Sequence, residues 1–447
     1  MKTCFLKFAF FVDNHISHFH ALKGVAGRLI KAGHEVHFFC PEDLSGKITE
    51  EGFFCTGVNF LNGDLQIQRK GWNLYTAAAV KKSVNDKAAY IYTLGQKIMA
   101  DYHPDLIVFD PFLLHYWPAF KLEGVDAVSV STKPLFTKDR LVPPYTSPLI
   151  PEDTITGRFL VQLEWCKNHI KYLRYRLRCV INELIYGESH RSLMHAIAKH
   201  SGYNLSEDWF TRPLFYDMRL KSVPELVLHA AEMDFPRSGS LASAGSFIGP
   251  CTDLPPFIMP DHLPAGDGPL IWINLGTVAK QRKGLTLHYY RALIEAVYEI
   301  SGCRAVIATA DKSITRELSV YSDKYSDRIL VKTWTVRASY LHIADLVVTH
   351  GGSNSVKEAV LAGKPMLAIP HSADQPGMAA RIVFHGLGKI CLQPNKKNLK
   401  KVLLELLEND CYKKSVSEMR STFLRYDDED ICVKVLENAA KGIVPSF

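Results

Sequence analysis

The feature that most constrains the fold of this chain is an alternation of strand-like and helix-like segments that occurs twice. In the first half, the apolar run FLKFAFFV (5–12) predicts a buried strand, and ALKGVAGRLIKAG (21–33) predicts an amphipathic helix. Further buried strands are expected at EVHFFC (35–40) and DLIVFD (105–110). Strands that alternate with helices form a parallel sheet with helices on both faces, so the sequence predicts an α/β fold.

A stretch dense in Pro, Gly and Asp, PCTDLPPFIMPDHLPAGDG (250–268), interrupts the alternation and predicts a linker between two domains. The alternation then restarts, with a helix near 286–300. The strands expected in this second unit are 269–277, 305–310, 329–334, 345–350 and 366–370. Ligands of doubly wound sheets bind at the carboxyl ends of the strands, so two facing units predict one cleft between them.

The stretch THGGSNSVKEAVLAGKPMLAIPHSADQ (349–375) offers the groups that bind a phosphate. A strand leads through two glycines into a helix, where free backbone amides and the positive end of the helix dipole favour an anion. Ser355 and Glu358 also have capping-box spacing, so a well-capped structural helix is the alternative. Because a cap requires neither His350 nor Asn354, we interpret the stretch as a phosphate or diphosphate site.

Residues on either side of this stretch extend the interpretation. Trp334 ends a predicted strand, where its indole could stack on a flat base, although a core Trp is the common alternative. Asp374 and Gln375 follow another strand and could hold sugar hydroxyls, although for two such residues alone a loop cap would be the simpler explanation. Groups for a base, a diphosphate and a sugar, in that order, favour a nucleotide sugar as the ligand.

The segment 334–375 as a whole resembles the donor-binding signature of family 1 glycosyltransferases. The residues that match the family pattern are Trp334, Leu341, Thr349, His350, Gly352, Asn354, Ser355, Glu358, Gly363, Pro365, Pro370, Asp374 and Gln375. FIGP (247–250) and INLGT (273–277) are similar to segments on either side of the linker in that family. The family has the GT-B fold, in which two Rossmann-like, doubly wound parallel-sheet domains face each other across a cleft.

The resemblance implies how the chain is organised. An acceptor-binding, Rossmann-like domain is expected at 1–249, a linker at 250–268, and a nucleotide-sugar-binding, Rossmann-like domain at 269–425. Residues 426–447 are expected to form a C-terminal helix that packs back on the N-terminal domain.

The resemblance also implies a role for each matching residue. Trp334 would stack on the nucleobase, and Glu358 would bind the ribose hydroxyls. The diphosphate would be held by Thr277, His350, Gly352, Asn354 and Ser355, and the hydroxyls of the donor sugar by Asp374 and Gln375. Val336-Arg337 stands where the family has Pro-Gln, so Arg337 would replace the Gln or reach a phosphate. This departure leaves open whether the donor is a UDP-sugar, as we expect, or a dTDP-sugar.

Three histidines, His15, His18 and His20, follow the first predicted strand, and each alone is typical of a solvated loop. The family has its catalytic base in a Gly-His-x-x-Pro segment before a helix, and the resemblance places His18 at that position, with Ser and Ala where the family has Gly and Pro. DLIVFDP resembles the family strand that ends in the carboxylate partner of the base, which implies Asp110. On its own, Asp110 would be interpreted as a turn cap.

These residues imply a single inverting displacement. His18 would accept the proton of the acceptor hydroxyl, and the helix start at 352–356 would stabilise the departing nucleoside diphosphate. Neither a metal nor a cofactor is then expected, with the nucleotide sugar as co-substrate. The acidic triplet Asp428-Glu429-Asp430 is interpreted as the start of a helix, where the dipole favours carboxylates, and not as a metal site.

The acceptor is expected to be a small lipophilic alcohol or phenol that receives a hexose. SHFHAL (17–22) and DQPGMAARI (374–382) resemble carotenoid glucosyltransferases of the zeaxanthin type and related bacterial enzymes. The helical segment 159–186 interleaves basic residues with apolar and aromatic ones, so it could make peripheral contact with anionic lipid. We favour the alternative, an amphipathic helix with a solvated basic face.

The remaining features narrow the class of protein. Ten dispersed cysteines without zinc spacing, and an N-terminal apolar run broken by Lys7, favour a cytoplasmic chain that is at most membrane-associated. A non-catalytic nucleotide-sugar binder on the same fold is the alternative to an enzyme. An NAD enzyme is disfavoured because GxGxxG is missing after the first strand. A nucleic-acid partner is not expected, because only the net charge of +7 favours one.

Overall fold

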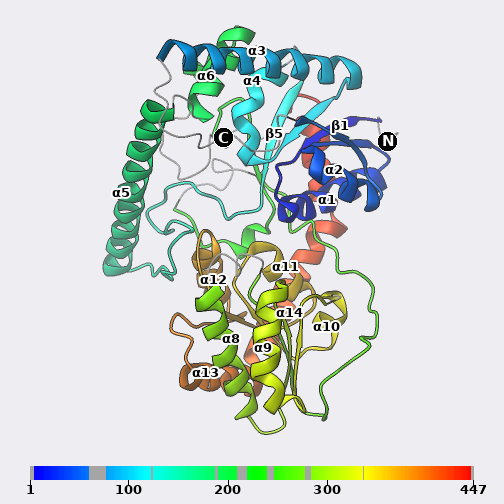
Figure 1. The fold of residues 1–447 in the computed structure, drawn as a ribbon, viewed down its shortest axis with the longest axis vertical. Helices are drawn as coiled ribbons and strands as arrows, with labels where there is room; N and C mark the ends of the chain where they lie inside the picture. Colours follow the sequence, from blue (N-terminus) through cyan, green and yellow to red (C-terminus); the bar gives the residue numbers. More distant parts are fainter. Residues whose placement is uncertain are drawn as a thin grey trace.

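The computed structural model describes residues 5–59, 77–121, 124–186, 190–208, 219–238, 246–276, 283–335 and 337–443. It consists of two α/β domains, one above the other in Figure 1. The N-terminal domain contains a seven-stranded sheet in the order β3-β2-β1-β4-β5-β6-β7, and the C-terminal domain a six-stranded sheet in the order β10-β9-β8-β11-β12-β13. Neighbouring strands pair in parallel in both sheets. The predicted α/β fold with two doubly wound units is therefore confirmed.

The N-terminal sheet is built around two largely apolar strands, β1 and β4. Its strands are β1 (Lys7–Phe11), β2 (Glu35–Cys40), β3 (Phe54–Gly57), β4 (Leu106–Phe109), β5 (Asp126–Ser131), β6 (Glu225–Val227) and β7 (Ser246–Phe247). Residues 8–11 of β1 and all of β4 are buried, as expected for parallel strands covered on both faces. The sheet order reverses between these two strands, which makes their carboxyl ends the topological switch point.

Helices cover both faces of this sheet. They are α1 (Ile16–Lys31), α2 (Glu42–Glu50), α3 (Ala77–Tyr102), α4 (Trp117–Phe120), α5 (Ile155–Tyr186), α6 (His190–Ser201) and α7 (Leu205–Asp208), with the 3-10 helices η2 (Pro111–Tyr116) and η3 (Ala231–Met233). One apolar core lies under α1 and another under α3, α4 and α6. α1 begins at Ile16, earlier than the pattern predicts, because the buried Phe19 extends its apolar face toward β1.

The C-terminal domain repeats the same plan. Its strands are β8 (Leu270–Asn274), β9 (Arg304–Ala308), β10 (Ile329–Lys332), β11 (Leu346–Thr349), β12 (Met366–Ala368) and β13 (Gly388–Ile390). Its helices are α8 (Lys283–Tyr298), α9 (Lys312–Ser322), α10 (Arg337–Ile343), α11 (Ser353–Leu361), α12 (Gln375–Phe384) and α13 (Lys396–Glu408), with the 3-10 helix η6 (Asp323–Tyr325). The switch point of this sheet lies between β8 and β11.

The last two helices divide their packing between the domains. α14 (Cys411–Asp428) packs into the core of the C-terminal domain through Val416, Met419 and Phe423. α15 (Ile431–Ala439) packs against α1 in the N-terminal core, where Cys432, Val433 and Leu436 are buried. The triplet 428–430 stands at the helix start that we expected only through Asp430, the N-cap of α15, since Asp428 ends α14 and Glu429 is its C-cap. It joins α14 to α15, and Asp430 adopts a left-handed backbone (φ 51°) that turns the chain between the two helices.

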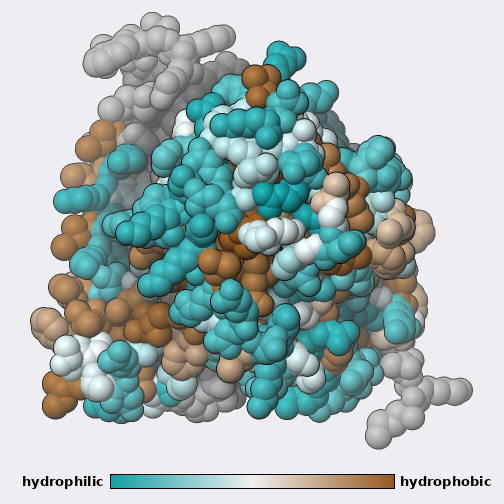
Figure 2. All heavy atoms as spheres, turned by 90° about the horizontal axis from the view of Figure 1, so that it is seen from below, coloured by the Kyte–Doolittle hydropathy of each residue, from teal (hydrophilic) through white to brown (hydrophobic). Residues whose placement is uncertain are grey.

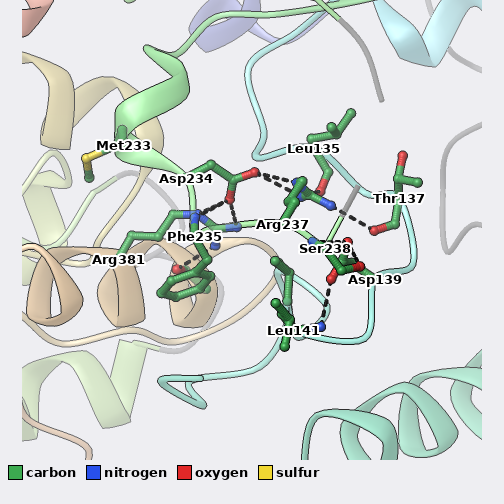
Figure 3. A network of polar contacts seen from close by, with 12 residues as sticks. Leu135, Thr137, Asp139, Leu141, Met233, Asp234, Phe235, Arg237, Ser238 and Arg381 are labelled. Atoms are coloured by element: carbon green, nitrogen blue, oxygen red, sulfur yellow. Dashed lines mark hydrogen bonds and ion pairs between the residues drawn. The ribbon is translucent and has the colours of Figure 1, made fainter. Parts of the chain in front are cut away.

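A buried ion pair joins the two domains beside α12 (Figure 3). Asp234 follows η3, and its Oδ1 accepts a hydrogen bond from Nε of Arg381 on α12 at 3.0 Å. Its Oδ2 accepts one from Nε of Arg237 at 2.9 Å. Burial alone would raise the pKa of Asp234, but the charges of Arg381 and Arg237 hold the pKa below its ordinary value. The carboxylate therefore stays charged inside the interface and fixes α12 against the N-terminal domain.

Candidate active site

Two side chains at the switch point of the N-terminal sheet form the centre of the candidate site. His18 lies in the first turn of α1, just after β1, and Asp110 follows β4, which pairs with β1. Nδ1 of His18 lies 2.6 Å from Oδ2 of Asp110. The other carboxylate oxygen accepts a hydrogen bond from the backbone N–H of Phe112 at 2.9 Å, and Asp110 is only 1% exposed. The structure thus brings together the two residues that the resemblance implies as base and partner.

The surroundings of His18 favour its protonated form. Burial alone would lower the pKa of His18, but the charge and hydrogen bond of Asp110, together with the charge of Asp13, raise the pKa to about 9. Because Nδ1 is engaged by the carboxylate, Nε2 is the nitrogen that can accept a proton from a substrate. The dyad has the arrangement of a general base with an orienting carboxylate.

Asp13 is a second carboxylate beside the same imidazole, and the sequence analysis did not identify it. Its Oδ1 lies 3.4 Å from Nδ1 of His18, and its Oδ2 lies 2.5 Å from Nδ1 of His15. Burial would raise the pKa of Asp13, but its contacts with His15 and the charge of His18 lower the pKa overall. The signal that could have revealed Asp13 is its position, since it lies at the carboxyl end of β1, next to the predicted base.

A small pocket opens beside the dyad. Its lining residues are His18, Leu22, Asp110, Pro111, Phe112, Val130, Ser131, Thr132 and Lys133. Nζ of Lys133 lies 4.4 Å from the centre of the Phe112 ring. Leu22, Pro111, Phe112 and Val130 form the apolar part of this lining, and the polar groups lie next to His18.

The loop between β11 and α11 is the segment predicted to bind the diphosphate. α11 begins at Ser353 with Gly352 as its N-cap, and no side chain caps it. Ser355 therefore lies inside the helix, and the capping box that we considered as an alternative does not form. A Cβ on Gly352 would lie 2.3 Å from the His350 ring, and one on Gly276, whose φ is +77°, would lie 2.7 Å from it. Only glycines at these two positions leave room for the His350 imidazole at the start of the helix.

Three hydrogen bonds connect this loop and its helix to the N-terminal domain and to the first residue of the predicted linker. Nδ2 of Asn354 donates to the backbone oxygen of Ser17 at 3.2 Å, next to His18. Oγ of Ser353 lies 2.7 Å from Nε2 of the buried His229. Nζ of Lys357 donates to the backbone oxygen of Pro250 at 2.9 Å. The start of α11 and the start of α1 thus meet at one place.

Two of these interface residues, His229 and Lys357, were missed by the sequence analysis. Burial lowers the pKa of His229 to about 3, so the ring is neutral. Burial also lowers the pKa of Lys357, to about 8, which leaves it largely charged near neutral pH behind the anion loop. No local motif marks either residue, because their importance comes only from the contact between the domains.

The other predicted donor residues follow strands of the same sheet edge. Trp334 lies after β10 and is 67% exposed, and Glu358 lies half-buried on α11. Asp374 and Gln375 begin α12 after β12, but Gln375 is buried, and its Oε1 accepts hydrogen bonds from the backbone N–H groups of His371 and Ser372. That oxygen therefore fixes the loop before α12. Thr277, Val336 and the side chain of Arg337 lie outside the described residues.

The ligand atoms of Asp13, His18 and Asp110 lie within 4.8 Å of one another, a spacing that could also hold a metal ion. The expectation of a metal-independent site thus stays a prediction. Within the described part of the chain, no helix is long and apolar enough to span a membrane.

Comparison with known proteins identifies relatives of this fold and site. The family model for the glycosyltransferase family 28 C-terminal domain matches residues 291–429. A zeaxanthin glucosyltransferase of Pantoea ananas is 31% identical over 35% of this chain and 35% of its own. A demethyllactenocin mycarosyltransferase of Streptomyces fradiae is 22% identical over 96% of this chain and 85% of its own. The alignments with the zeaxanthin glucosyltransferases of Pantoea ananas and Pseudescherichia vulneris span only 35% and 40% of those relatives.

Solved structures extend the similarity of the fold to nearly the whole chain. The glycotransferase of kitacinnamycin superposes with a TM-score of 0.64 at 16% identity and covers 99% of this chain and 100% of its own. Glycosyltransferase VinC, solved in complex with DTDP, gives a TM-score of 0.60 at 17% identity over 97% of this chain and 100% of its own. Together these similarities confirm the GT-B fold and the resemblance to family 1 glycosyltransferases.

Proposed function

We propose that this family 1-like GT-B protein is an inverting, metal-independent glycosyltransferase that moves a hexose from a nucleotide sugar to a hydroxyl of a small lipophilic acceptor. The proposal takes a UDP-sugar as the donor. One observation carries it: the His18–Asp110 dyad and the start of α11 lie side by side, joined by the hydrogen bond from Asn354 to Ser17. A proton acceptor and an anion site in one place are what transfer from a nucleotide sugar requires.

In the proposed reaction, the acceptor enters the pocket beside Phe112 and directs a hydroxyl at Nε2 of His18. His18 removes the proton as the oxygen attacks the anomeric carbon, and Asp110 stabilises the imidazolium that forms. The bond between the anomeric carbon and the diphosphate breaks on the opposite face of the sugar, which inverts the configuration.

The nucleoside diphosphate departs with additional negative charge. The amide groups at the start of α11 and the imidazole of His350 face the region where the diphosphate would lie. Lys357, buried behind this turn, adds positive charge to the same region. Trp334 would stack on the base, Glu358 would bind the ribose, and Asp374 would bind the donor sugar.

Similarity to relatives supports the class of acceptor. The proteins that share sequence or fold with this chain include a zeaxanthin glucosyltransferase and the glycotransferase of kitacinnamycin. The partly apolar pocket beside His18 agrees with such an acceptor.

The test is sugar transfer by the purified chain, followed by mass spectrometry with UDP- and dTDP-sugars and a panel of phenols, sterols, carotenoid diols and macrolides. We expect one donor to give a glycosylated product, and His18→Ala to lose transfer while it keeps the donor affinity of the wild type. Equal loss of donor binding in His18→Ala would instead assign His18 a structural role.

A non-catalytic nucleotide-sugar binder is the second candidate. The buried carboxylate–imidazole pair argues against it, because a protein that only binds the donor gains nothing from a desolvated base in the acceptor pocket. Tight donor binding without product across the acceptor panel, and unchanged by His18→Ala, would favour this candidate.

A further inference from the structure

Helix α5 carries a row of large apolar side chains that face solvent. Most of these side chains lie three or four residues apart, with one gap of seven between Leu163 and Ile170, and the helical period places them along one side of the helix. The row consists of Ile155, Phe159, Leu163, Ile170, Leu173, Leu177, Val180 and Ile181. Their exposed fractions range from 41% for Leu163 to 89% for Ile155. Hydrophobic residues line the left edge of the molecule in Figure 2, on the side where Figure 1 shows α5.

This row is separate from the side of α5 that holds the helix on the protein. Val161 and Trp165 are buried in a small core with Phe136 and Tyr145. Nε1 of Trp165 also donates a hydrogen bond to the backbone oxygen of Val142 at 2.8 Å. Because α5 already has a packed face, the exposed row is not needed for folding, and its exposure requires another explanation.

Basic side chains flank the exposed row on both sides. By the helical period, Lys167, Arg174 and Arg178 follow one border of the row, and Arg158 and Arg176 follow the other. All five are exposed, and Lys171 adds a sixth base to the same helix. Among the described side chains of α5, Glu164 is the one acidic residue, and it is paired with Lys167. An apolar strip between two lines of positive charge is the pattern of a helix that lies in the surface of an anionic bilayer.

We propose that α5 docks the protein on an anionic lipid bilayer, with the apolar row inserted among the acyl chains and the flanking bases on the headgroups. The positive charge of α5 favours an anionic lipid surface over a second copy of the chain as the partner of the apolar row. Two α5 helices paired through their rows would bring six bases on one helix near six on the other, against the two acids, Glu164 and Glu183, in the sequence of each helix. An anionic bilayer attracts the same positive charges, whereas a second α5 helix repels them.

The dimensions of the row also suit a flat surface. From Ile155 to Ile181 the helix rises about 40 Å, and the row stays on one side over this length. The segment before α5 contacts the donor domain, since the backbone oxygen of Tyr145 accepts a hydrogen bond from the N–H of Gly377 on α12 at 2.9 Å. A docked α5 would therefore hold the cleft close to the bilayer. This position suits a lipophilic acceptor if the proposed function is correct.

The test is flotation of the full chain with vesicles, without donor or acceptor, so that the result does not depend on sugar transfer. The vesicles contain phosphatidylcholine alone or an equal mixture of phosphatidylcholine and phosphatidylglycerol. We expect binding to the anionic vesicles that weakens as salt is raised. The double variant Phe159→Ser/Leu177→Ser should reduce partitioning at least about tenfold. Arg174→Gln/Arg178→Gln should reduce it by about fivefold per charge removed, on anionic vesicles only.

Matched controls come from helix α9 of the other domain. Val320→Ser removes a side chain that is 79% exposed, and Lys312→Gln/Arg316→Gln removes two exposed bases. Neither should change partitioning. Absence of binding to anionic vesicles, or equal losses in the α9 variants, would overturn the proposal. A dimer in light scattering that Phe159→Ser/Leu177→Ser dissociates, in a chain that does not bind vesicles, would assign the row to a second copy instead.

Discussion

Replacing Asp110 by Asn isolates the charge of the carboxylate that contacts His18. The two side chains have nearly the same shape, and the Asn oxygen can still accept the hydrogen bond that the N–H of Phe112 donates to Asp110. The change therefore leaves the turn after β4 in place and removes only the negative charge and the preferred tautomer of the imidazole.

The size of the effect follows from the pKa of His18. This pKa is raised from 6.5 to about 9, with Asp110 the largest favourable cause. The shift corresponds to about 3 kcal/mol that favours the imidazolium, and it leaves about 1% of the wild-type base neutral at pH 7. Without the Asp110 charge, the pKa should fall toward 6.5, although Asp13 at 3.4 Å keeps part of the shift.

The assay is the pH dependence of kcat/KM for the acceptor. In the wild type, kcat/KM should rise about tenfold per pH unit and level off near pH 9. In Asp110→Asn, kcat/KM should level off at a lower pH, and the plateau should be about 10²- to 10⁴-fold lower because the imidazolium is no longer stabilised. Asp13→Asn is the matched control. In this variant the pH at which kcat/KM levels off should fall less than in Asp110→Asn. If kcat/KM in Asp110→Asn levels off at the same pH as in the wild type, the reasoning is refuted.

The same shift predicts how stability depends on pH. The folded pKa of His18 lies above the unfolded value, so the stabilisation is complete below about pH 6.5 and is lost as the pH rises through about 9. Chemical unfolding at a series of pH values should show this loss in the wild type and a smaller one in Asp110→Asn. A parallel decline in both proteins would assign the pH dependence to other groups.

Three further predictions use other parts of the site. Arg337→Ala should weaken the affinity for the donor with little change in kcat, as measured by calorimetry with UDP- and dTDP-sugars; equal affinity for every nucleotide would remove the role proposed for the Val-Arg departure. Arg381→Met removes one partner of the buried Asp234 and should lower the free energy of unfolding by about 3 kcal/mol in urea titrations. Dialysis against EDTA should leave transfer unchanged; loss of activity that a divalent metal restores would instead assign a metal to Asp13, His18 and Asp110.

The sequence predicted β1, β2, β4 and β8 to β12, because parallel strands buried on both faces are apolar runs, as in residues 8–11 of β1 and all of β4; it did not predict β3, β5, β6, β7 or β13. The roles of His18 and Asp110 came from the resemblance to family 1 glycosyltransferases, because the residues alone predict a solvated loop histidine and a turn cap. Asp13, His229 and Lys357 could not be predicted in this way. Asp13 has no local motif beyond its place after β1, and the other two depend on how the two domains meet.

The helix α5 shows a second limit of what can be predicted from the sequence. The sequence indicated an amphipathic helix with a solvated basic face at 159–186, with contact to anionic lipid as the alternative. In the structure a narrow face around Trp165 packs in a small core, and the longer apolar row from Ile155 to Ile181 faces solvent. Hydrophobic periodicity reports which residues share a side of a helix, but it does not report which side the rest of the chain covers.

The packing of α15 against α1 has a consequence for synthesis on the ribosome. The core beneath α1 includes Leu436 and Ala439, so the N-terminal domain shares its interior with residues translated after the whole C-terminal domain. Until residue 439 has left the exit tunnel, the nascent N-terminal domain exposes apolar surface on α1 that α15 later covers. The N-terminal domain is therefore synthesised first but can complete its core only after the C-terminal domain and α15 have left the ribosome.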